Sequence, residues 1–274
     1  MDDGWKVVSK LREVDYRLSR LGYSYAYASS NHLLKNKYAE GGKPHIVWVH
    51  EPVEVALLND ELMCRYKTDI KRRERKEVFD TFIGQFVSHN HGEFGGELIT
   101  PKEVMGGNFI DIFECDGVVY GIDSCNHMGI GHTNIYAFDE KANATHIFGT
   151  KGRDLFDDGI REHMAHRATY MTDDSVYILV SGECGISYPR NNGSWQDKTY
   201  LLVINKGELK EKIEFDFELG SVQNMIVHNN QLVVGLNKVA GIIDLSTKEI
   251  KAYTGLGKGA IKNLMSSRDK GGWD

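Results

Sequence analysis

The sequence has no long apolar run, no closely spaced pair of cysteines and no excess of basic residues. No stretch approaches the roughly 20 apolar residues that a membrane-spanning helix needs. The four cysteines are far apart and form no CxxC pair, so neither a disulfide framework nor a zinc knuckle is expected. The net charge of -6 argues against a broad basic face that would coat nucleic acid. We therefore expect neither a membrane nor nucleic acid as a partner.

The beginning of the chain also lacks the signature of a secretory signal. Residues 1–6 read MDDGWK, which is acidic where a signal peptide has a basic segment followed by an apolar one. Together with the isolated thiols, this start favours a cytoplasmic location. The composition, 41% hydrophobic and 26% charged, is that of a globular protein, and 274 residues can bury a core without disulfides or metals.

The segment from Trp5 to Leu21 shows the periodicity of an amphipathic helix. Its apolar residues recur at spacings of three and four, and Gly22 follows as a helix stop. These apolar residues are Val7, Leu11, Val14, Leu18 and Leu21. We predict a helix packed on the main domain, within an N-terminal segment 1–43, followed by a β-propeller domain 44–260 and a C-terminal tail 261–274.

From about residue 78 to residue 253 the sequence alternates short strand-like segments with Asp, Asn and Gly turns. Three successive units each hold four such segments and occupy roughly 40 to 50 residues, the length of a propeller blade. The expected strands are 108–114, 118–123, 134–139 and 145–148; 168–171, 176–181, 199–205 and 209–215; and 222–227, 231–236, 241–245 and 248–253. Before them, 45–49 and 53–58 read as a hairpin-like pair of strands.

This rhythm predicts the fold class. A single four-stranded sheet leaves two apolar faces, and stacking several such sheets around an axis covers both. We therefore predict an all-β protein, a small β-propeller with about five four-stranded blades and the N-terminal helix packed on it. Four or six blades are variants of this prediction, and a β-sandwich is the competing fold.

Polar loops recur between the second and third strands of the units. The most unusual is SHNHGEFGGEL at 88–98, and others lie at 123–132 and 181–187. Loops at equivalent blade positions converge on the same end of a propeller and can build one pocket. The candidate ligand-binding residues in these loops are His89, His91, Glu93, Asp123, His127, His132 and Glu183.

Imidazole and carboxylate groups in such a pocket fit two uses. One is recognition of a ligand without catalysis. The other is a divalent metal held by His91, His127 and Glu183 that activates water for hydrolysis or supports lyase chemistry. No H-E-x-x-H, G-x-S-x-G or closed Cys/His array is present, and histidines are common in tight polar turns. A purely structural role therefore also stays open, and the sequence leaves enzymatic activity undecided.

The stretch NHGEFGGEL at 90–98, followed by blade-like units, resembles a pattern found in uncharacterised bacterial β-propeller proteins. WD40 and kelch signatures are missing, and the resemblance transfers no catalytic residue. The resemblance implies a bacterial propeller. Our leading hypothesis is that it acts as a binding or scaffold module, recognising a protein or small ligand through one polar loop face. The net charge permits a more specific version, an acidic protein that neutralises a basic toxin. A metal-assisted hydrolase or lyase is the alternative.

Overall fold

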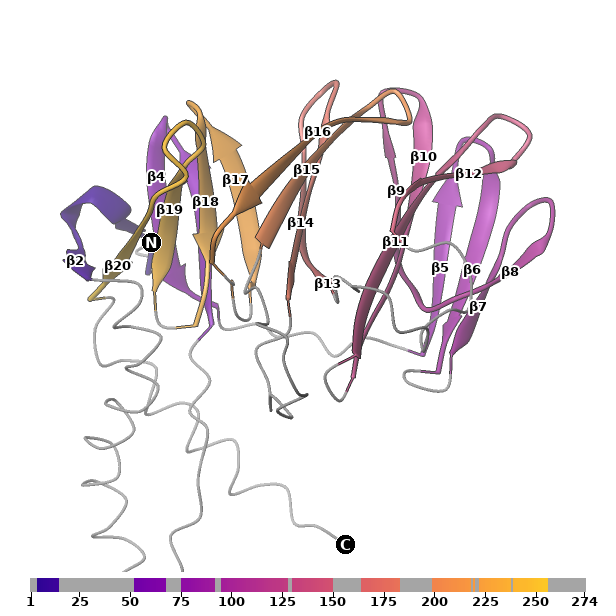
Figure 1. Cartoon of the computed structure of the whole chain (residues 1–274), viewed down its shortest axis with the longest axis horizontal. Helices are drawn as coiled ribbons and strands as arrows, with labels where there is room; N and C mark the ends of the chain where they lie inside the picture. Colours follow the sequence, from indigo (N-terminus) through magenta and orange to yellow (C-terminus); the bar gives the residue numbers. More distant parts are fainter. Residues whose placement is uncertain are drawn as a thin grey trace, which may run out of the picture. The chain divides into compact units, whose positions relative to one another are not determined.

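A computed structural model describes residues 4–14, 52–67, 75–91, 95–127, 130–149, 164–182, 199–217, 219, 222–237 and 239–255, with the backbone alone at 14, 126, 127, 130, 131 and 182. Regular structure in these segments is β-strand apart from one 3-10 helix, Val8–Lys10 (Figure 1). The described residues include no helix long and apolar enough to cross a membrane. The chain divides into two compact units, one of residues 70–222 and one of residues 1–69 with 223–274.

The unit of residues 70–222 consists of three consecutive antiparallel meanders. Each is a four-stranded sheet whose strands lie side by side in chain order (Figure 1). The strands are β5 (Lys76–Thr81), β6 (Gly84–Asn90), β7 (Gly96–Ile99) and β8 (Val104–Gly106); β9 (Phe109–Cys115), β10 (Val118–His127), β11 (Ile130–Phe138) and β12 (Ala144–Phe148); and β13 (Met164–Met171), β14 (Val176–Gly182), β15 (Thr199–Asn205) and β16 (Glu208–Phe215).

The other unit contains two sheets that combine strands from both ends of the chain. One has the order β1-β4-β3, and the other has the order β17-β18-β19-β20-β2. The strands are β1 (Lys6–Val7), β2 (Arg12–Val14), β3 (Val53–Leu58), β4 (Glu61–Tyr66), β17 (Asn224–His228), β18 (Gln231–Gly235), β19 (Ala240–Asp244) and β20 (Ile250–Thr254). Strands near the N-terminus therefore complete sheets that begin elsewhere in the sequence.

Five separate blade-like sheets confirm the predicted propeller class of all-β fold, and they differ from the two layers of a β-sandwich. All twelve strands expected in the three repeating units are present, eleven of them with shifted bounds. The prediction of four strands in every blade is met by three sheets, while the described parts of the other two hold three and five strands.

The predicted helix at Trp5–Leu21 is wrong over the residues that the structure describes. Residues 6–14 form β1, a 3-10 turn and β2, and the remainder of the predicted helix lies outside the described residues. Val7 pairs with Met63, and Val14 pairs with Ala252, so these apolar residues extend two sheet edges. Backbone hydrogen bonds to those sheet edges stabilise the extended conformation. They outweigh the helix preference of a segment whose apolar periodicity spans few turns. The predicted strand 45–49 also lies outside the described residues, and β3 pairs with β4.

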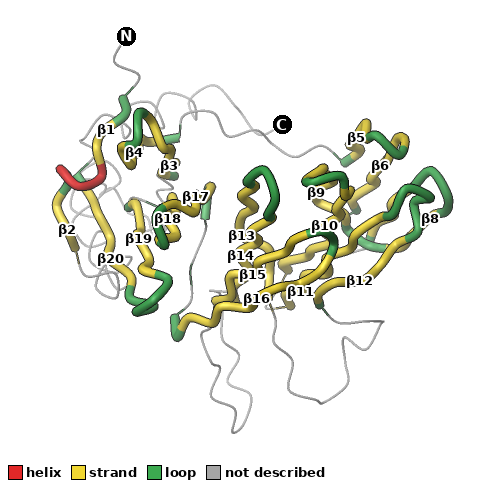
Figure 2. The backbone as a smooth tube through the Cα atoms, turned by 90° about the horizontal axis from the view of Figure 1, so that it is seen from above, coloured by secondary structure: helices red, strands yellow, loops and turns green. Residues whose placement is uncertain are grey.

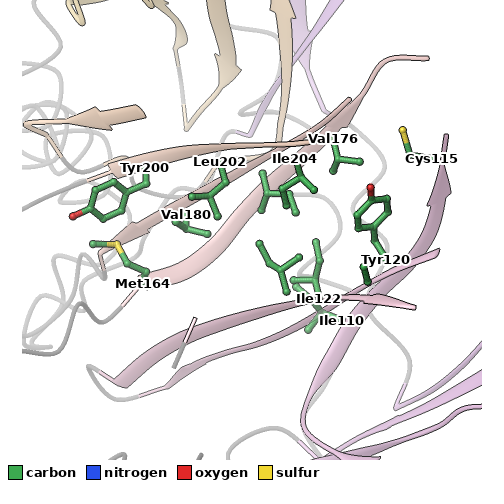
Figure 3. Close-up of a cluster of buried hydrophobic side chains, with 13 residues drawn as sticks. Ile110, Cys115, Tyr120, Ile122, Met164, Val176, Val180, Tyr200, Leu202 and Ile204 are labelled. Atoms are coloured by element: carbon green, nitrogen blue, oxygen red, sulfur yellow. The ribbon is translucent and has the colours of Figure 1, made fainter. Parts of the chain in front are cut away.

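The middle sheet of the unit 70–222 is buried on both faces. One face packs on β5–β8, where Phe86 and Phe138 meet edge to face with ring centroids 5.0 Å apart. The other face packs on β13–β16 through Ile122 and its neighbours, and the side chains of the two sheets face one another in Figure 3. Burial of this continuous apolar surface explains why several sheets are needed before any one of them is stable.

Buried serines near the ends of the second strands form hydrogen bonds with later parts of the chain. Ser88 near the end of β6 donates to the Phe109 carbonyl (2.7 Å), and Ser124 Oγ accepts the N–H of His166 (3.1 Å). Ser181 Oγ accepts the N–H of Leu219, the residue that follows the third sheet (3.0 Å). The first two contacts thereby tie the second strand of one sheet to the first strand of the next sheet in this unit, so corresponding strand ends stay together.

Candidate functional site: the Asp123 cluster

The strands that lead into the three predicted loops end on the same side of the unit 70–222. The C-terminal ends of β6, β10 and β14 all lie toward the lower edge of Figure 1. The described residues at these ends include the polar groups that the sequence selected on β6 and β10. The geometry of those groups can therefore be compared directly.

Asp123 on β10 is the best-defined polar group at this end. It is only 5% exposed, and its carboxylate accepts hydrogen bonds from two groups in addition to contacting an imidazole. The N–H of Asn108 donates to Oδ1 (2.7 Å), and Nδ2 of Asn134 donates to Oδ2 (2.9 Å). These charge-assisted hydrogen bonds compensate for the desolvation of the carboxylate.

Local strand geometry brings these groups together. Asp123 and Asn134 are register partners on β10 and β11, so their side chains leave the same face of the hairpin. A bulge between Ile122 and Asp123 shifts the pairing with β9, so that Asp123 lies opposite Phe109. This shift places Asp123 beside the N–H of Asn108 at the entrance of β9.

His132 completes the contact from the same face of β11. Its Nε2 lies 3.3 Å from Asp123 Oδ1, and its side chain is 19% exposed. His146 Nε2 lies 3.4 Å from Asn134 Oδ1, and its ring meets Tyr136 edge to face. We call these five residues the Asp123 cluster: Asn108, Asp123, His132, Asn134 and His146.

The backbone passes close to one side of the cluster, and the charge of Asp123 acts on a neighbouring hydroxyl. Burial raises the pKa of the Tyr136 hydroxyl, and the negative charge of Asp123 raises it further. Gly149 has φ +110°, and a Cβ there would lie 2.4 Å from Asn134 Oδ1. A glycine is therefore required where the backbone passes the cluster.

His89 does not join the Asp123 cluster. It lies on the other face of its sheet from Ser88, because successive strand residues point to opposite faces, and its Nδ1 lies 2.9 Å from Glu97 Oε1. His91 is exposed, and its N–H donates to the Gly95 carbonyl (2.9 Å) to close the turn after β6.

The structure therefore brings together two of the predicted ligand-binding residues, Asp123 and His132. Glu93 and Glu183 lie outside the described residues, as does the side chain of His127. The metal site at His91, His127 and Glu183 stays a prediction. Among the residues that the structure describes, no group of three or more His, Cys, Asp or Glu side chains could hold a metal ion.

Sequence reasoning missed three members of the cluster: Asn108, Asn134 and His146. A signal for Asn134 was present, because the hairpin that joins the second and third strands of this unit pairs it with Asp123. Asn108 could be found only with knowledge of the bulge, which is a feature of three-dimensional pairing.

The sheets and the cluster define a β-propeller protein with a polar site at one set of strand ends. No protein-family model matches the sequence, and no curated protein matches it. Among solved structures, the chain is similar to the N-terminal domain of Nup159, with 9% identity and a TM-score of 0.32. That match covers 83% of this chain and 72% of the other chain.

Proposed function

We propose that the chain is a binding or scaffold module of the bacterial cytoplasm that recognises a protein or a small ligand at the Asp123 cluster. The contact between the His132 ring and the buried Asp123 carboxylate is the observation that supports this function. A carboxylate only accepts hydrogen bonds, so the contact directs the N–H of His132 Nε2 toward Asp123, and in the tautomer that carries this proton Nδ1 is an acceptor. The cluster thus presents that nitrogen in a fixed orientation.

Fixed orientation favours binding because less side-chain freedom is lost when a ligand arrives. The Asp123 carboxylate is held by Asn108 and Asn134, and it in turn holds the His132 ring. A ligand with an N–H or O–H group suits the lone pair on Nδ1. Specificity would come from the resulting hydrogen bond, because a site built to bind such a group discriminates against analogues without it.

We expect His132→Ala to weaken ligand retention by about tenfold, since one hydrogen bond with an oriented partner contributes roughly 1 kcal/mol or more. The purified protein is incubated with the small-molecule and protein fractions of a bacterial lysate, and retained species are quantified by mass spectrometry. His228→Ala is the matched control, because His228 is a half-buried histidine at the end of β17, outside this unit. Equal retention by both variants would contradict binding at the cluster.

The toxin-neutralising version of this function requires a basic partner. Supporting charges lie at the turns between β9 and β10 and between β13 and β14, where Asp116, Asp173 and Asp174 are exposed. Burial raises the pKa of the nearby Cys115 thiol, and the charges of these three carboxylates raise it further. The negative potentials of the three carboxylates therefore add on the surface near Cys115, where a cationic protein would be attracted.

We expect simultaneous conversion of Asp116, Asp173 and Asp174 to Asn to weaken binding of an oligolysine peptide about tenfold at low salt. Each exposed ion pair contributes roughly 0.2–1 kcal/mol, so three together reach that size. Fluorescence anisotropy measures the affinity, and added salt should reduce it. The control converts three exposed glutamates elsewhere to Gln, namely Glu140, Glu211 and Glu249. An equal loss in the control would show that only net charge matters.

A further inference from the structure

The face of the β5–β8 sheet turned away from β9–β12 carries a continuous apolar row. Val78, Val87, Ile99 and Val104 are register partners across the four strands (Figure 2 shows the sheet from above). Val78, Ile99 and Val104 are 51%, 37% and 61% exposed, and Phe82 in the adjoining turn is 54% exposed. The opposite face is already filled by Phe86 and its neighbours, so this sheet is apolar on both faces.

Polar rows border the apolar row on both sides. On one side, Gln85 donates to Asp80 (3.0 Å). On the other side lie Lys76 and the pair formed by His89 and Glu97. Lys76 and Asp80 are both exposed, and they flank Val78 at equal spacing along β5 with opposite charge. An exposed apolar strip with a polar rim has the make-up of a protein interface.

We propose that this face, made of the apolar row and its two polar rows and called the Val78 face, is where a second copy of the chain docks. The two-fold axis runs parallel to the apolar row. Rotation about this axis places the apolar row on its own copy and exchanges the polar rows. Lys76 of each copy then lies beside Asp80 of the other, which is the charge complementarity that selects this occupant.

The size of the face predicts a reversible dimer. Four strands about 4.8 Å apart and five residues long cover on the order of 300 Å² per copy, compared with about 800 Å² in a standard interface. Exposed Phe82 extends the contact at one end. The dimer therefore exchanges with monomer, and its population depends on protein concentration. The Val78 face is separate from the Asp123 cluster, so the dimer and the ligand proposal fail independently.

Sedimentation equilibrium of the full chain, from about 5 to about 500 µM at low salt, tests the dimer across the affinity range of small interfaces. The weight-average mass of the wild type should rise toward that of two chains. Val104→Asp should raise the dissociation constant at least about tenfold, because it buries a charge in the apolar row. Leu209→Asp, at an exposed apolar residue on β16, is the control and should leave the dimer unchanged.

Charge exchange tests the axis without disturbing the core. Lys76→Asp and Asp80→Lys should each weaken the dimer about fivefold, and the double variant should return to within about twofold of the wild type. A mass that stays at one chain at every concentration overturns the proposal, including the case in which another part of the same chain covers the face. A dimer that survives Val104→Asp places the contact elsewhere and also overturns it. If Val104→Asp abolishes the dimer but the double charge variant dimerises no better than the single charge variants, the proposed axis is overturned.

Discussion

Replacing Asp123 by alanine should lower the free energy of unfolding by about 3 kcal/mol or more, because each buried polar group left without its partner costs about 1–3 kcal/mol. The substitution removes the acceptor for the N–H of Asn108 and for the amide of Asn134, and it also removes the contact with His132. Urea denaturation followed by far-UV circular dichroism measures the loss. Asp123 is 5% exposed, so water cannot readily replace the lost acceptor.

Asp80→Ala is the matched control for this substitution. Asp80 is also a strand aspartate, but it is exposed and accepts one hydrogen bond, from Gln85. Its replacement should cost less than about 1 kcal/mol at protein concentrations where the chain is monomeric. If the two variants were equally stable, the carboxylate of Asp123 would not be organising the cluster, and the preoriented imidazole would lose its support.

The turns could be predicted from sequence because their chemistry is local. Asp116, Lys206 and Asn229 have positive φ in the structure, at the places where the sequence has Asp-Gly, Lys-Gly and Asn-Asn pairs between strand-like segments. Apolar alternation on either side then fixes the strands within a few residues. The blade rhythm of residues 108–253 follows from these short-range signals.

The N-terminal strands could not be predicted in this way because their partners are distant in sequence. Lys6 pairs with Cys64, and Arg12 pairs with Thr254. A spacing of three and four over residues 7–14 fits a helix when the segment is considered alone. The sheet edges that it joins become visible only when the fold is assembled, so local periodicity gave the wrong element.

The candidate site shows the same division between local and distant information. Asp123 and His132 belong to one hairpin, and their proximity follows from its register. His89 was grouped with them because its loop occupies the equivalent blade position. The structure separates it because the burial of Phe86 and Ser88 directs even-numbered residues of β6 toward β9–β12. A loop sequence alone does not reveal which alternate residues face the core.

In the unit of residues 1–69 with 223–274, we expect Gly235→Ala to lower the free energy of unfolding by about 3 kcal/mol, the upper part of the range for overpacked cores. An added Cβ would lie 2.1 Å from the carbonyl oxygen of Val53 and 2.9 Å from Asn224 Oδ1. Gly235 has no positive φ, so close approach of β18 and β3 is the whole reason for glycine here. Gly106→Ala is the control, because a Cβ there meets nothing within 4 Å.

The position of the amides that lose protection distinguishes displacement of β3 from a general loss of stability in Gly235→Ala. The side chain of Asn224 accepts from the Val55 N–H (2.9 Å) and donates to the Val55 carbonyl (2.7 Å), and the Val53 N–H donates to Leu236 (2.8 Å). An alanine at Gly235 must displace β3 and so break these bonds first. Hydrogen exchange should therefore show the amides of Val53 and Val55 losing protection before those of β19. Uniform loss across the sheet would mean that β3 is held mainly by apolar burial, and that the glycine and asparagine contacts are secondary.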